Sequence, residues 1–428
     1  MPATVRHRNN CRLCERNNVE LVVKLEPIPL AEKYSLSSDT AKSAELFPID
    51  LYMCRDCGHV QLLDVIDSET LWDDYTYHSG QTKGIVDHFQ EVADKIVQRY
   101  KPQSSGLVVD IGSNDGSFLR QFKERGYRVA GVDPAREIAN KATDCGIPTI
   151  AALMSTDVTN EIITKYGSAS VVTAFNVFAH ADDLSGMAEN IRMLLAPDGV
   201  FVFECQYLVD IIDKFLLGTI FHEHMSHHSL KPMVKFLASH GMELIDVERN
   251  SIQKGSIVGT AQLVGGPHKK TSAVDELLAL EASKQIESAE TIKSLSVRIN
   301  KIHKQFSEVV EQCRRDKKVL AGFGAARSGP TLLAQFGIGP HVEYIFDDHP
   351  QKTGKYSPGD GIKVLPTSEL NVLKPDYVVI LAWIHAKKII ESNQEYLKKG
   401  GKFIVCCPDF EVVDSRAIEQ RDACSVAR

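Results

Sequence analysis

The chain has 428 residues, which is too long for one ordinary hydrophobic core, and 43% of them are hydrophobic and 25% charged, as in a globular protein. A formal net charge of −7 argues against nucleic acid or an anionic membrane surface as a partner. No apolar run approaches the roughly 20 residues that span a bilayer, and "MPATVRHRNNCRLC" lacks the apolar core of a signal peptide. We therefore expect a cytoplasmic protein whose ten cysteines are thiols or metal ligands.

The first 80 residues contain two CxxC pairs, Cys11 with Cys14 and Cys54 with Cys57. Each pair suits a tight turn that brings two thiolates to one tetrahedral ion, and four thiolates leave zinc no open position. A redox CxxC would need a thioredoxin-like βαβ context, which this region does not show. We expect residues 1–80 to be a module that binds a structural Zn²⁺.

Strand and helix patterns alternate over residues 81–270, as in "LVVDIG", "SFLRQFKERG" and "RVAGVD". This alternation is typical of βαβ units on a parallel sheet, so we expect an α/β domain.

The glycine loop after the first of these strands, "DIGSNDGSF", has the spacing D-x-G-x-x-x-G. It departs from the dinucleotide motif G-x-G-x-x-G because Asp110 precedes a single glycine in the first turn, and a pyrophosphate avoids a nearby negative charge. A carboxylate suits a ligand with a positive end, such as S-adenosylmethionine, and Asp133 ends the next strand where ribose hydroxyls would lie. The alternative is a βα turn without a ligand. Together with "FNVFAH", the pattern resembles class I methyltransferases and predicts a cofactor site formed by Asp110, Gly112, Asn114, Gly116, Asp133 and Asn176.

The stretch "FHEHMSHHSL" places four histidines and a glutamate in ten residues. The metalloprotease motif H-E-x-x-H fails because residue 226 is Ser226. A transition-metal site using His224 with His227 or His228 is an alternative. So is a solvated polar face for His227 and His228, and His222 has the alternative of a hydrogen-bonded structural role.

Residues 271–318 have helical spacing and are expected to form a helical linker. Residues 319–412 return to strand–helix alternation, which predicts a smaller Rossmann-like domain, and residues 413–428 form a tail. The Rossmann-like domain contains the loop "GFGAARSG", followed by Asp347, which supports an alternative function as an NAD(P)-linked sugar-nucleotide oxidoreductase. The displacement of the third glycine to Gly329 and the shortness of this domain weigh against that alternative.

Several motifs occur together in one order: the paired CxxC, "DDYTYHSG", "DIGSNDGSF", "NVFAHADDL", "FECQYL", "FHEHMSHHSL" and "GFGAARSGPTLL…DDHPQKTGKYSPG". In this the chain resembles the sugar C-methyltransferases of deoxysugar biosynthesis over nearly its whole length. The resemblance implies a class I methyltransferase (Rossmann-like) domain with an N-terminal zinc-binding module and a C-terminal Rossmann-like, substrate-binding domain that helps to form the sugar-nucleotide cleft. It also implies an S-adenosylmethionine-dependent enzyme.

The implied substrate is a nucleotide-linked 4-keto-deoxysugar, carried on thymidine diphosphate or another nucleotide, and the expected assembly is a monomer or small homo-oligomer. Methylation at carbon requires removal of an α-proton to give an enolate, and His is the usual base near neutral pH. The resemblance assigns this base to His224 and makes Glu223 a substrate-contacting or supporting carboxylate. The further candidates for positioning the sugar or stabilising the enolate are Tyr75, Tyr77 and His180.

One position departs from the family pattern, because Phe221 stands where relatives have Tyr before "HEH". A hydroxyl contact made there in relatives would be absent in this chain. In the C-terminal loop, Arg327 or Lys352 is expected to meet phosphate. The alternative is that both are surface cations, and we prefer that alternative for Lys352.

Overall fold

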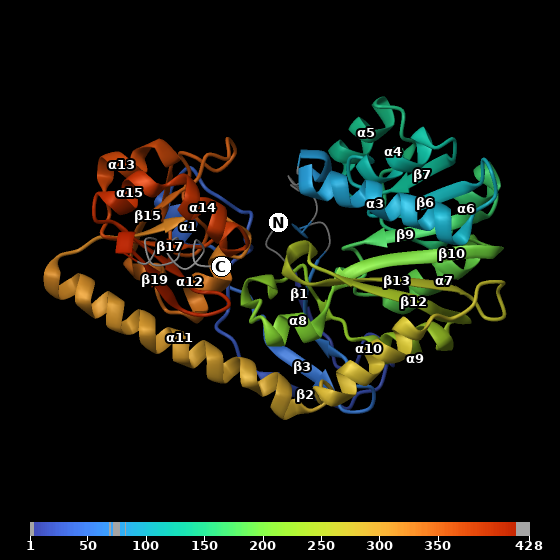
Figure 1. Ribbon diagram of the computed structural model, residues 1–428, viewed down its shortest axis with the longest axis horizontal. Helices are drawn as coiled ribbons and strands as arrows, with labels where there is room; N and C mark the ends of the chain where they lie inside the picture. The colour runs from blue at the N-terminus through green and yellow to red at the C-terminus, as the bar shows by residue number, and fades with distance from the viewer. Residues whose placement is uncertain (1–3, 68–69, 72–77, 82, 417–428) are drawn as a thin grey trace, which may run out of the picture. The chain divides into compact units, whose positions relative to one another are not determined.

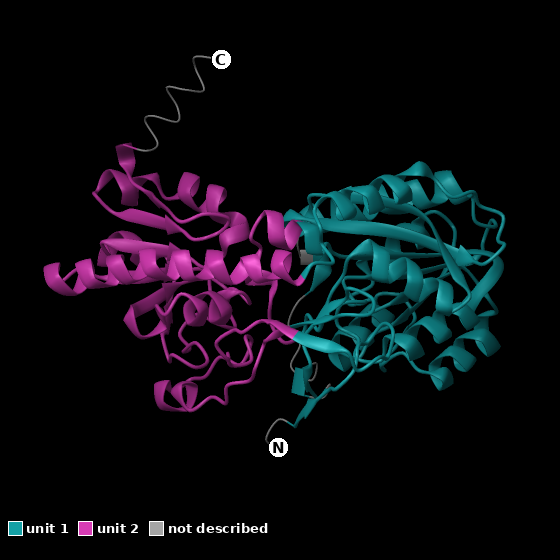
Figure 2. Cartoon of the chain, turned by 90° about the horizontal axis from the view of Figure 1, so that it is seen from below, with its two compact units in different colours: residues 1–20, 52–209, 223–288 teal, residues 21–51, 210–222, 289–428 magenta. Residues whose placement is uncertain are grey.

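The computed structural model describes residues 4–67, 70–71, 78–81 and 83–416. These form two compact units, shown in teal and magenta in Figure 2. Unit 1 comprises residues 1–20, 52–209 and 223–288, and unit 2 comprises residues 21–51, 210–222 and 289–428. The division cuts across the consecutive domains expected from the sequence, since residues 21–51 belong with the C-terminal unit.

Unit 1 is built on a seven-stranded sheet with the order β12-β13-β10-β9-β6-β7-β8. The strands β6 to β10 run parallel to one another, whereas β13 is antiparallel to both β10 and β12. Their bounds are β6 Leu107–Ile111, β7 Arg128–Val132, β8 Thr149–Ile150, β9 Ala169–Phe175, β10 Leu195–Gln206, β12 Met242–Asn250 and β13 Ser256–Leu263. The order reverses between β6 and β9, and ligands of such sheets bind at the carboxyl ends of the strands at this point.

Helices cover both faces of this sheet (Figure 1). On one face, α3, α4 and α5 supply apolar side chains such as Phe89, Phe118 and Ala142 to a core that includes Val108 and Val171 of the strands. The helices of this part of the chain are α3 Lys83–Tyr100, α4 Ser117–Glu124, α5 Arg136–Asp144, α6 Thr156–Tyr166, α7 Leu184–Leu194, α8 Leu208–Asp213, α9 Leu230–Ser239 and α10 Ser272–Ser283. The predicted α/β sheet is therefore present.

The cysteine-bearing residues form small antiparallel sheets. One pairs β1 (Val5–His7) with β5 (Asp64–Ile66), and the other has the order β11-β4-β3-β2. The bounds of the latter strands are β2 Val19–Val23, β3 Leu51–Cys54, β4 Val60–Gln61 and β11 Ser226–His227. Because β11 comes from the histidine-rich segment, that segment completes the sheet of the cysteine module.

Unit 2 contains a second Rossmann-like sheet with the order β16-β15-β14-β17-β18-β19. All neighbouring pairs are parallel except β18 with β19. The strands are β14 Leu320–Phe323, β15 Val342–Phe346, β16 Lys363–Leu365, β17 Tyr377–Ile380, β18 Lys402–Val405 and β19 Glu411–Val413. The helices of this unit are α1 Ser38–Lys42, α11 Ala289–Asp316, α12 Gly329–Gln335, α13 Leu370–Leu373, α14 Ala386–Ser392 and α15 Gln394–Lys398. The order again reverses beside the first strand, between β14 and β17.

The predicted linker helices are α10 and α11, which fall in different units. The long helix α11 (Figure 1) buries one stripe of side chains at intervals of three and four residues, namely Ile292, Leu295, Ile299, Ile302, Phe306, Val310 and Cys313. Among the described residues, no helix combines the length and apolar character that a membrane crossing requires.

Candidate functional site

The expected cofactor residues gather at the carboxyl edge of the unit 1 sheet, where the strand order reverses. Asp110 lies in β6, and Thr173 of the neighbouring β9 donates a hydrogen bond of 2.6 Å to its carboxylate. Burial raises the pKa of Asp110 to about 7, and the hydrogen bond from Thr173 opposes this rise. Asn176 follows β9 in a left-handed conformation, with φ of 57°.

The loop after β6 is braced by Asp133, which follows β7. One Asp133 oxygen accepts the backbone N–H of Asn114 at 2.8 Å, and the other accepts that of Ala135, also at 2.8 Å. Burial raises the pKa of Asp133, while these two donors act in the opposite direction. Gly112, with φ of 71°, approaches the loop after β9 so closely that a Cβ would lie 2.2 Å from Val177 Cγ2.

These residues fit S-adenosylmethionine. Two buried carboxylates at one sheet edge suit hydroxyl groups and a positive charge, and they disfavour the pyrophosphate of a dinucleotide. Asp133 keeps further lone pairs for ribose hydroxyls, since each of its oxygens accepts one backbone donor. The Gly112 turn leaves backbone in place of side chain at the mouth of the loop, and Gly116, with φ of 74°, caps the start of α4.

A second polar group at this edge was not predicted from the sequence. Glu204, fully buried in β10, accepts from His88 of α3 at 3.0 Å and from the side-chain amide of Asn250 at 2.8 Å. Its backbone carbonyl accepts the N–H of Asn176 at 2.8 Å. The sequence feature that could have predicted this group is the charged residue inside the apolar run "GVFVFECQ". A charged residue is expensive to bury without partners, so partners were to be expected.

His180 and His224 lie together, although 44 positions separate them in the sequence. Their rings stack with centroids 5.0 Å apart and planes inclined by 22°. His180 follows β9 by five residues, and His224 lies two residues before β11. Both side chains are half-buried, so each keeps some access to solvent or substrate.

The other histidines of the segment are buried, and the expectation of a solvated face for His227 and His228 is wrong. Their exposed fractions are 2% and 1%. His227 lies in β11, which pairs with β4, and the ring of His228 stacks on that of His59 with centroids 5.4 Å apart. Burial lowers the pKa of His227 to about 3 and that of His228 to about 4. His222, in unit 2, lies 3.3 Å from the backbone oxygen of Phe47, and burial lowers its pKa to about 4. All three rings are therefore neutral at pH 7.

Of the remaining catalytic candidates, the structure describes Glu223 but not the two tyrosines. Glu223 is buried, with 7% of its surface exposed. Tyr75 and Tyr77 lie outside the described residues. A His-only metal site receives no support, since the one group of three or more potential ligands that converge in the described part of the chain is the cysteine quartet.

The ligand atoms of Cys11, Cys14, Cys54 and Cys57 all lie within 4.8 Å of one another. The sulfur atoms of Cys11 and Cys57 are 3.6 Å apart, and those of Cys14 and Cys54 are 3.5 Å apart. A tetrahedral zinc with bonds of about 2.3 Å would separate its sulfur ligands by about 3.8 Å. The quartet thus fits a Zn²⁺ ion with no coordination position left for chemistry.

The glycine loop of unit 2 has the same type of brace as that of unit 1. One oxygen of Asp347 accepts the N–H of Ala325 at 2.7 Å, and the other accepts that of His349 at 2.7 Å. Lys352 is not the surface cation that we preferred, because its side chain is only 12% exposed. Its ammonium group donates to Glu32 at 3.0 Å and to the carbonyl of Ala325 at 2.9 Å.

Comparison with known proteins gives three consecutive family matches. Residues 11–72 match a family described as "Putative zinc binding domain", residues 86–247 match "Methyltransferase domain", and residues 251–408 match "C-methyltransferase C-terminal domain". The last match covers the second glycine loop and assigns it to a methyltransferase rather than an oxidoreductase.

One relative matches along its full length. The C-methyltransferase NovU of Streptomyces niveus is 35% identical over 418 residues, which are 97% of this chain and 100% of that protein. Among solved structures, magnesium protoporphyrin IX methyltransferase of Synechocystis is 18% identical, with a TM-score of 0.33 over 45% of this chain and 91% of its own. The CcbJ methyltransferase of Streptomyces caelestis is 13% identical, with a TM-score of 0.33 over 45% of this chain and 95% of its own. With TM-scores this low, neither structure bears on function. The full-length relative and the three matches show that this chain belongs to the C-methyltransferases with an N-terminal zinc-binding domain, a methyltransferase domain and a C-methyltransferase C-terminal domain.

Proposed function

We propose that this C-methyltransferase acts on a nucleotide-linked 4-keto-deoxysugar and that His224 removes the α-proton beside the ketone. The observation that carries the proposal is the stacked pair of His180 and His224 in unit 1. When bound, S-adenosylmethionine supplies an electrophilic methyl group on a sulfonium. The remaining chemistry falls to the protein: a base for the α-proton and donors for the enolate oxygen.

His224 is the best base in its segment on grounds of environment. A general base works best with a pKa near the operating pH, and burial holds the pKa values of His222, His227 and His228 at about 4 or below. Of the four, His224 alone is only half-buried, so a substrate can approach its ring. Its neighbour in the stack, His180, is the proposed donor to the developing enolate oxygen.

We propose that Glu223, Tyr75 and Tyr77 contact the sugar. As a separate proposal for unit 2, its glycine loop binds a phosphate group. In that loop Arg327 is the better phosphate ligand of the two expected cations. A guanidinium can bind phosphate in a bidentate manner. Both cations contact Glu32, Arg327 through Nε at 3.5 Å and Lys352 at 3.0 Å, and the Lys352 ammonium also contacts the carbonyl of Ala325 and the face of Tyr34.

The test is proton exchange with a panel of nucleotide-linked 4-keto-sugars in deuterated water, followed by NMR in the presence of S-adenosylhomocysteine. The wild-type enzyme should exchange one α-proton of its substrate without methylating it. The His224→Gln variant should bind S-adenosylhomocysteine within about twofold of the wild type and lose exchange by about 100-fold or more.

His240→Gln is a matched control, because His240 pairs with Glu189 at 3.0 Å at the end of α9, outside the proposed site. This control should exchange normally. Unchanged exchange in His224→Gln would remove His224 as the base, and failure of every keto-sugar to exchange with the wild type would refute the proposed substrate class.

A further inference from the structure

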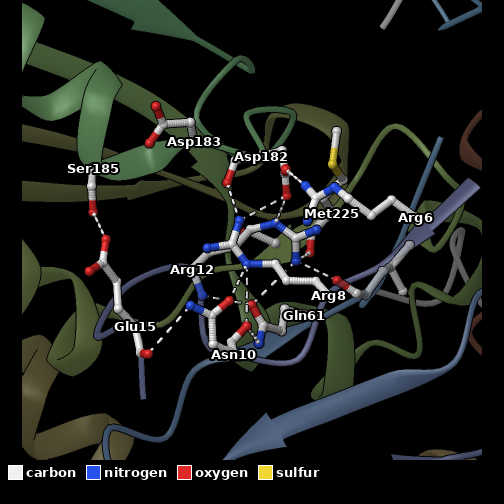
Figure 3. Close-up of polar contacts among 12 residues, drawn as sticks. Arg6, Arg8, Asn10, Arg12, Glu15, Gln61, Asp182, Asp183, Ser185 and Met225 are labelled. Atoms are coloured by element: carbon white, nitrogen blue, oxygen red, sulfur yellow. Dashed lines mark hydrogen bonds and ion pairs between the residues drawn. The ribbon is translucent and has the colours of Figure 1, made fainter. Parts of the chain in front are cut away.

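The zinc-binding knuckle carries a buried arginine that contacts residues next to the histidine pair in sequence. Arg12 lies between the two ligands of the first CxxC, and its side chain is fully buried. Its Nε donates to Asp182 at 3.1 Å, and its Nη1 lies 3.4 Å from the backbone oxygen of Met225 and also contacts that of Leu62. Figure 3 shows these contacts converging on one guanidinium.

These partners are close in sequence to the two stacked histidines. Asp182 lies two residues after His180, and Met225 directly follows His224. One rigid planar group therefore contacts both segments that carry the rings. The backbones of the same segments also meet, since the N–H of Ser226 donates to the carbonyl of Ala179 at 3.1 Å.

Two further arginines hold Asp182 in place. Arg8 donates to the Asp182 side chain at 3.0 Å and to its backbone carbonyl at 2.8 Å, and Arg6 pairs with the other carboxylate oxygen (Figure 3). A carboxylate fixed by three guanidinium groups has little rotational freedom. The three cations exceed the single carboxylate by two positive charges, and a zinc ion with four thiolates carries two negative charges. The arginine cluster and the metal site thus have complementary charge.

Stability alone does not account for Arg12. A buried guanidinium is costly to desolvate, and replacement of buried ion pairs by apolar residues is often neutral or stabilising. Within the described part of the chain, the Nη2 atom of Arg12 is buried and has no hydrogen-bond partner. The hydrogen bonds of Arg12 therefore do not fully offset the free-energy cost of removing its N–H groups from water.

We propose that Arg12 is a positioning residue, which ties the zinc knuckle to the segments of His180 and His224 and so sets the spacing of the histidine pair. This inference rests on the proposed function of that pair. Its consequence is that the metal module, which has no open coordination position, contributes to proton removal through the arginine placed between its ligands.

The test compares Arg12→Met with Arg16→Met. Arg16 lies just outside the same knuckle, its side chain is 70% exposed, and its contact with Asp56 is 3.6 Å, so its substitution should have no effect beyond twofold. Arg12→Met should keep its zinc, bind S-adenosylhomocysteine within twofold and retain the KM for the nucleotide sugar. It should slow α-proton exchange by about 10- to 100-fold, as expected for a misplaced base.

A second readout does not depend on the substrate. In protein with ¹³C-labelled histidine, the ring signals of His180 and His224, assigned with His180→Gln and His224→Gln, should move in Arg12→Met and stay in place in Arg16→Met. If Arg12→Met does not fold, Asp182→Asn takes its place, because it keeps the shape of the side chain and removes its charge.

The possible results are distinct. Normal exchange and unmoved ring signals in a folded, zinc-loaded Arg12→Met or Asp182→Asn would overturn the inference while leaving the proposed function intact. Absence of exchange in the wild type would refute the proposed function, and the ring signals would still decide whether Arg12 positions the pair.

Discussion

At the scale of single residues, the most informative group is Asp110. It is buried at 3% exposure beside a second carboxylate, Asp133, and burial raises its pKa to about 7. Carboxyl groups with strongly raised pKa values cluster at ligand-binding and catalytic sites. The α-ammonium group, which S-adenosylmethionine shares with S-adenosylhomocysteine, would stabilise the charged form of Asp110 and so recover the desolvation cost.

This shift predicts a pH dependence of stability. Between pH 4 and pH 7 the unfolded chain releases the Asp110 proton while the folded protein keeps it, so the cofactor-free protein loses stability as the pH rises through this window. Asp110→Asn cannot titrate. Its free energy of unfolding relative to wild type should therefore increase by at least about 1 kcal/mol between pH 5 and pH 8.

Urea denaturation at the two pH values measures this difference. Calorimetry adds a second expectation, since S-adenosylhomocysteine should bind the wild type more tightly at pH 8 than at pH 6, and Asp110→Asn should show a smaller change. A difference in unfolding free energy that stays constant with pH would contradict the assignment of a buried, protonated Asp110.

At the scale of elements, the loop between β6 and α4 depends on close backbone approach at Gly112. Both a φ of 71° and a hypothetical Cβ contact of 2.2 Å with Val177 oppose any side chain there. Gly126, in the turn before β7, has a φ of 86° but no neighbour within 4 Å of its hypothetical Cβ. A comparison of alanine substitutions at these two glycines therefore distinguishes the cost of backbone strain, which both share, from the cost of a steric clash, which only Gly112 has.

We expect Gly112→Ala to lower the free energy of unfolding by about 1–3 kcal/mol more than Gly126→Ala, because both substitutions strain φ and only the first also overpacks. Gly112→Ala should also weaken S-adenosylhomocysteine binding by at least about tenfold, since the loop must shift away from Val177. Gly126→Ala should bind normally. Equal losses of stability with normal binding in both variants would show that the loop tolerates a side chain.

How much of the molecule the sequence predicts depends on the range of the interaction. The cysteine quartet, the glycine loops and the strand–helix alternation are local patterns, and they predict the elements and the metal ligands. The stacking of His180 on His224 joins segments 44 positions apart and was not predicted, although both residues were named as candidates. The burial of His227 and His228 was missed because it depends on distant residues: His227 pairs with Val60 of β4, and the ring of His228 stacks on that of His59.

Ion pairs between residues far apart in the sequence could not be predicted either. Arg12 meets Asp182 across 170 positions, and Lys352 meets Glu32 across 320. No local pattern distinguishes such a cation from one on the surface, because its cost of burial is offset only by a partner that the fold supplies.

At the scale of the whole molecule, zinc should stabilise unit 1 more than unit 2. The four ligands belong to unit 1, and the strand β4 beside them pairs with β11 of the histidine segment. We expect Cys54→Ser to release zinc and to lower the unfolding temperature of unit 1, since structural zinc binding contributes directly to folding free energy. Unit 2 should unfold at a nearly unchanged temperature.

Hydrogen exchange with mass spectrometry, combined with zinc analysis, resolves the two units. Cys145→Ser is the matched control, because Cys145 is an exposed thiol at the end of α5 and is not a ligand. It should retain full zinc content and normal protection. Retention of zinc in Cys54→Ser, or equal loss of protection in both units, would contradict the assignment.

The pairing of β4 with β11 also has a consequence for synthesis on the ribosome. The last ligand, Cys57, emerges early, so the knuckle can take up its metal while most of the chain is still missing. The partner of Gln61 in the neighbouring strand is Ser226, 165 positions later. At about 5–20 residues per second, the open edge of β4 waits roughly 10 to 30 seconds for its neighbour. The nascent chain therefore passes through a long interval with a metal-loaded but incomplete sheet, in which a chaperone has time to bind.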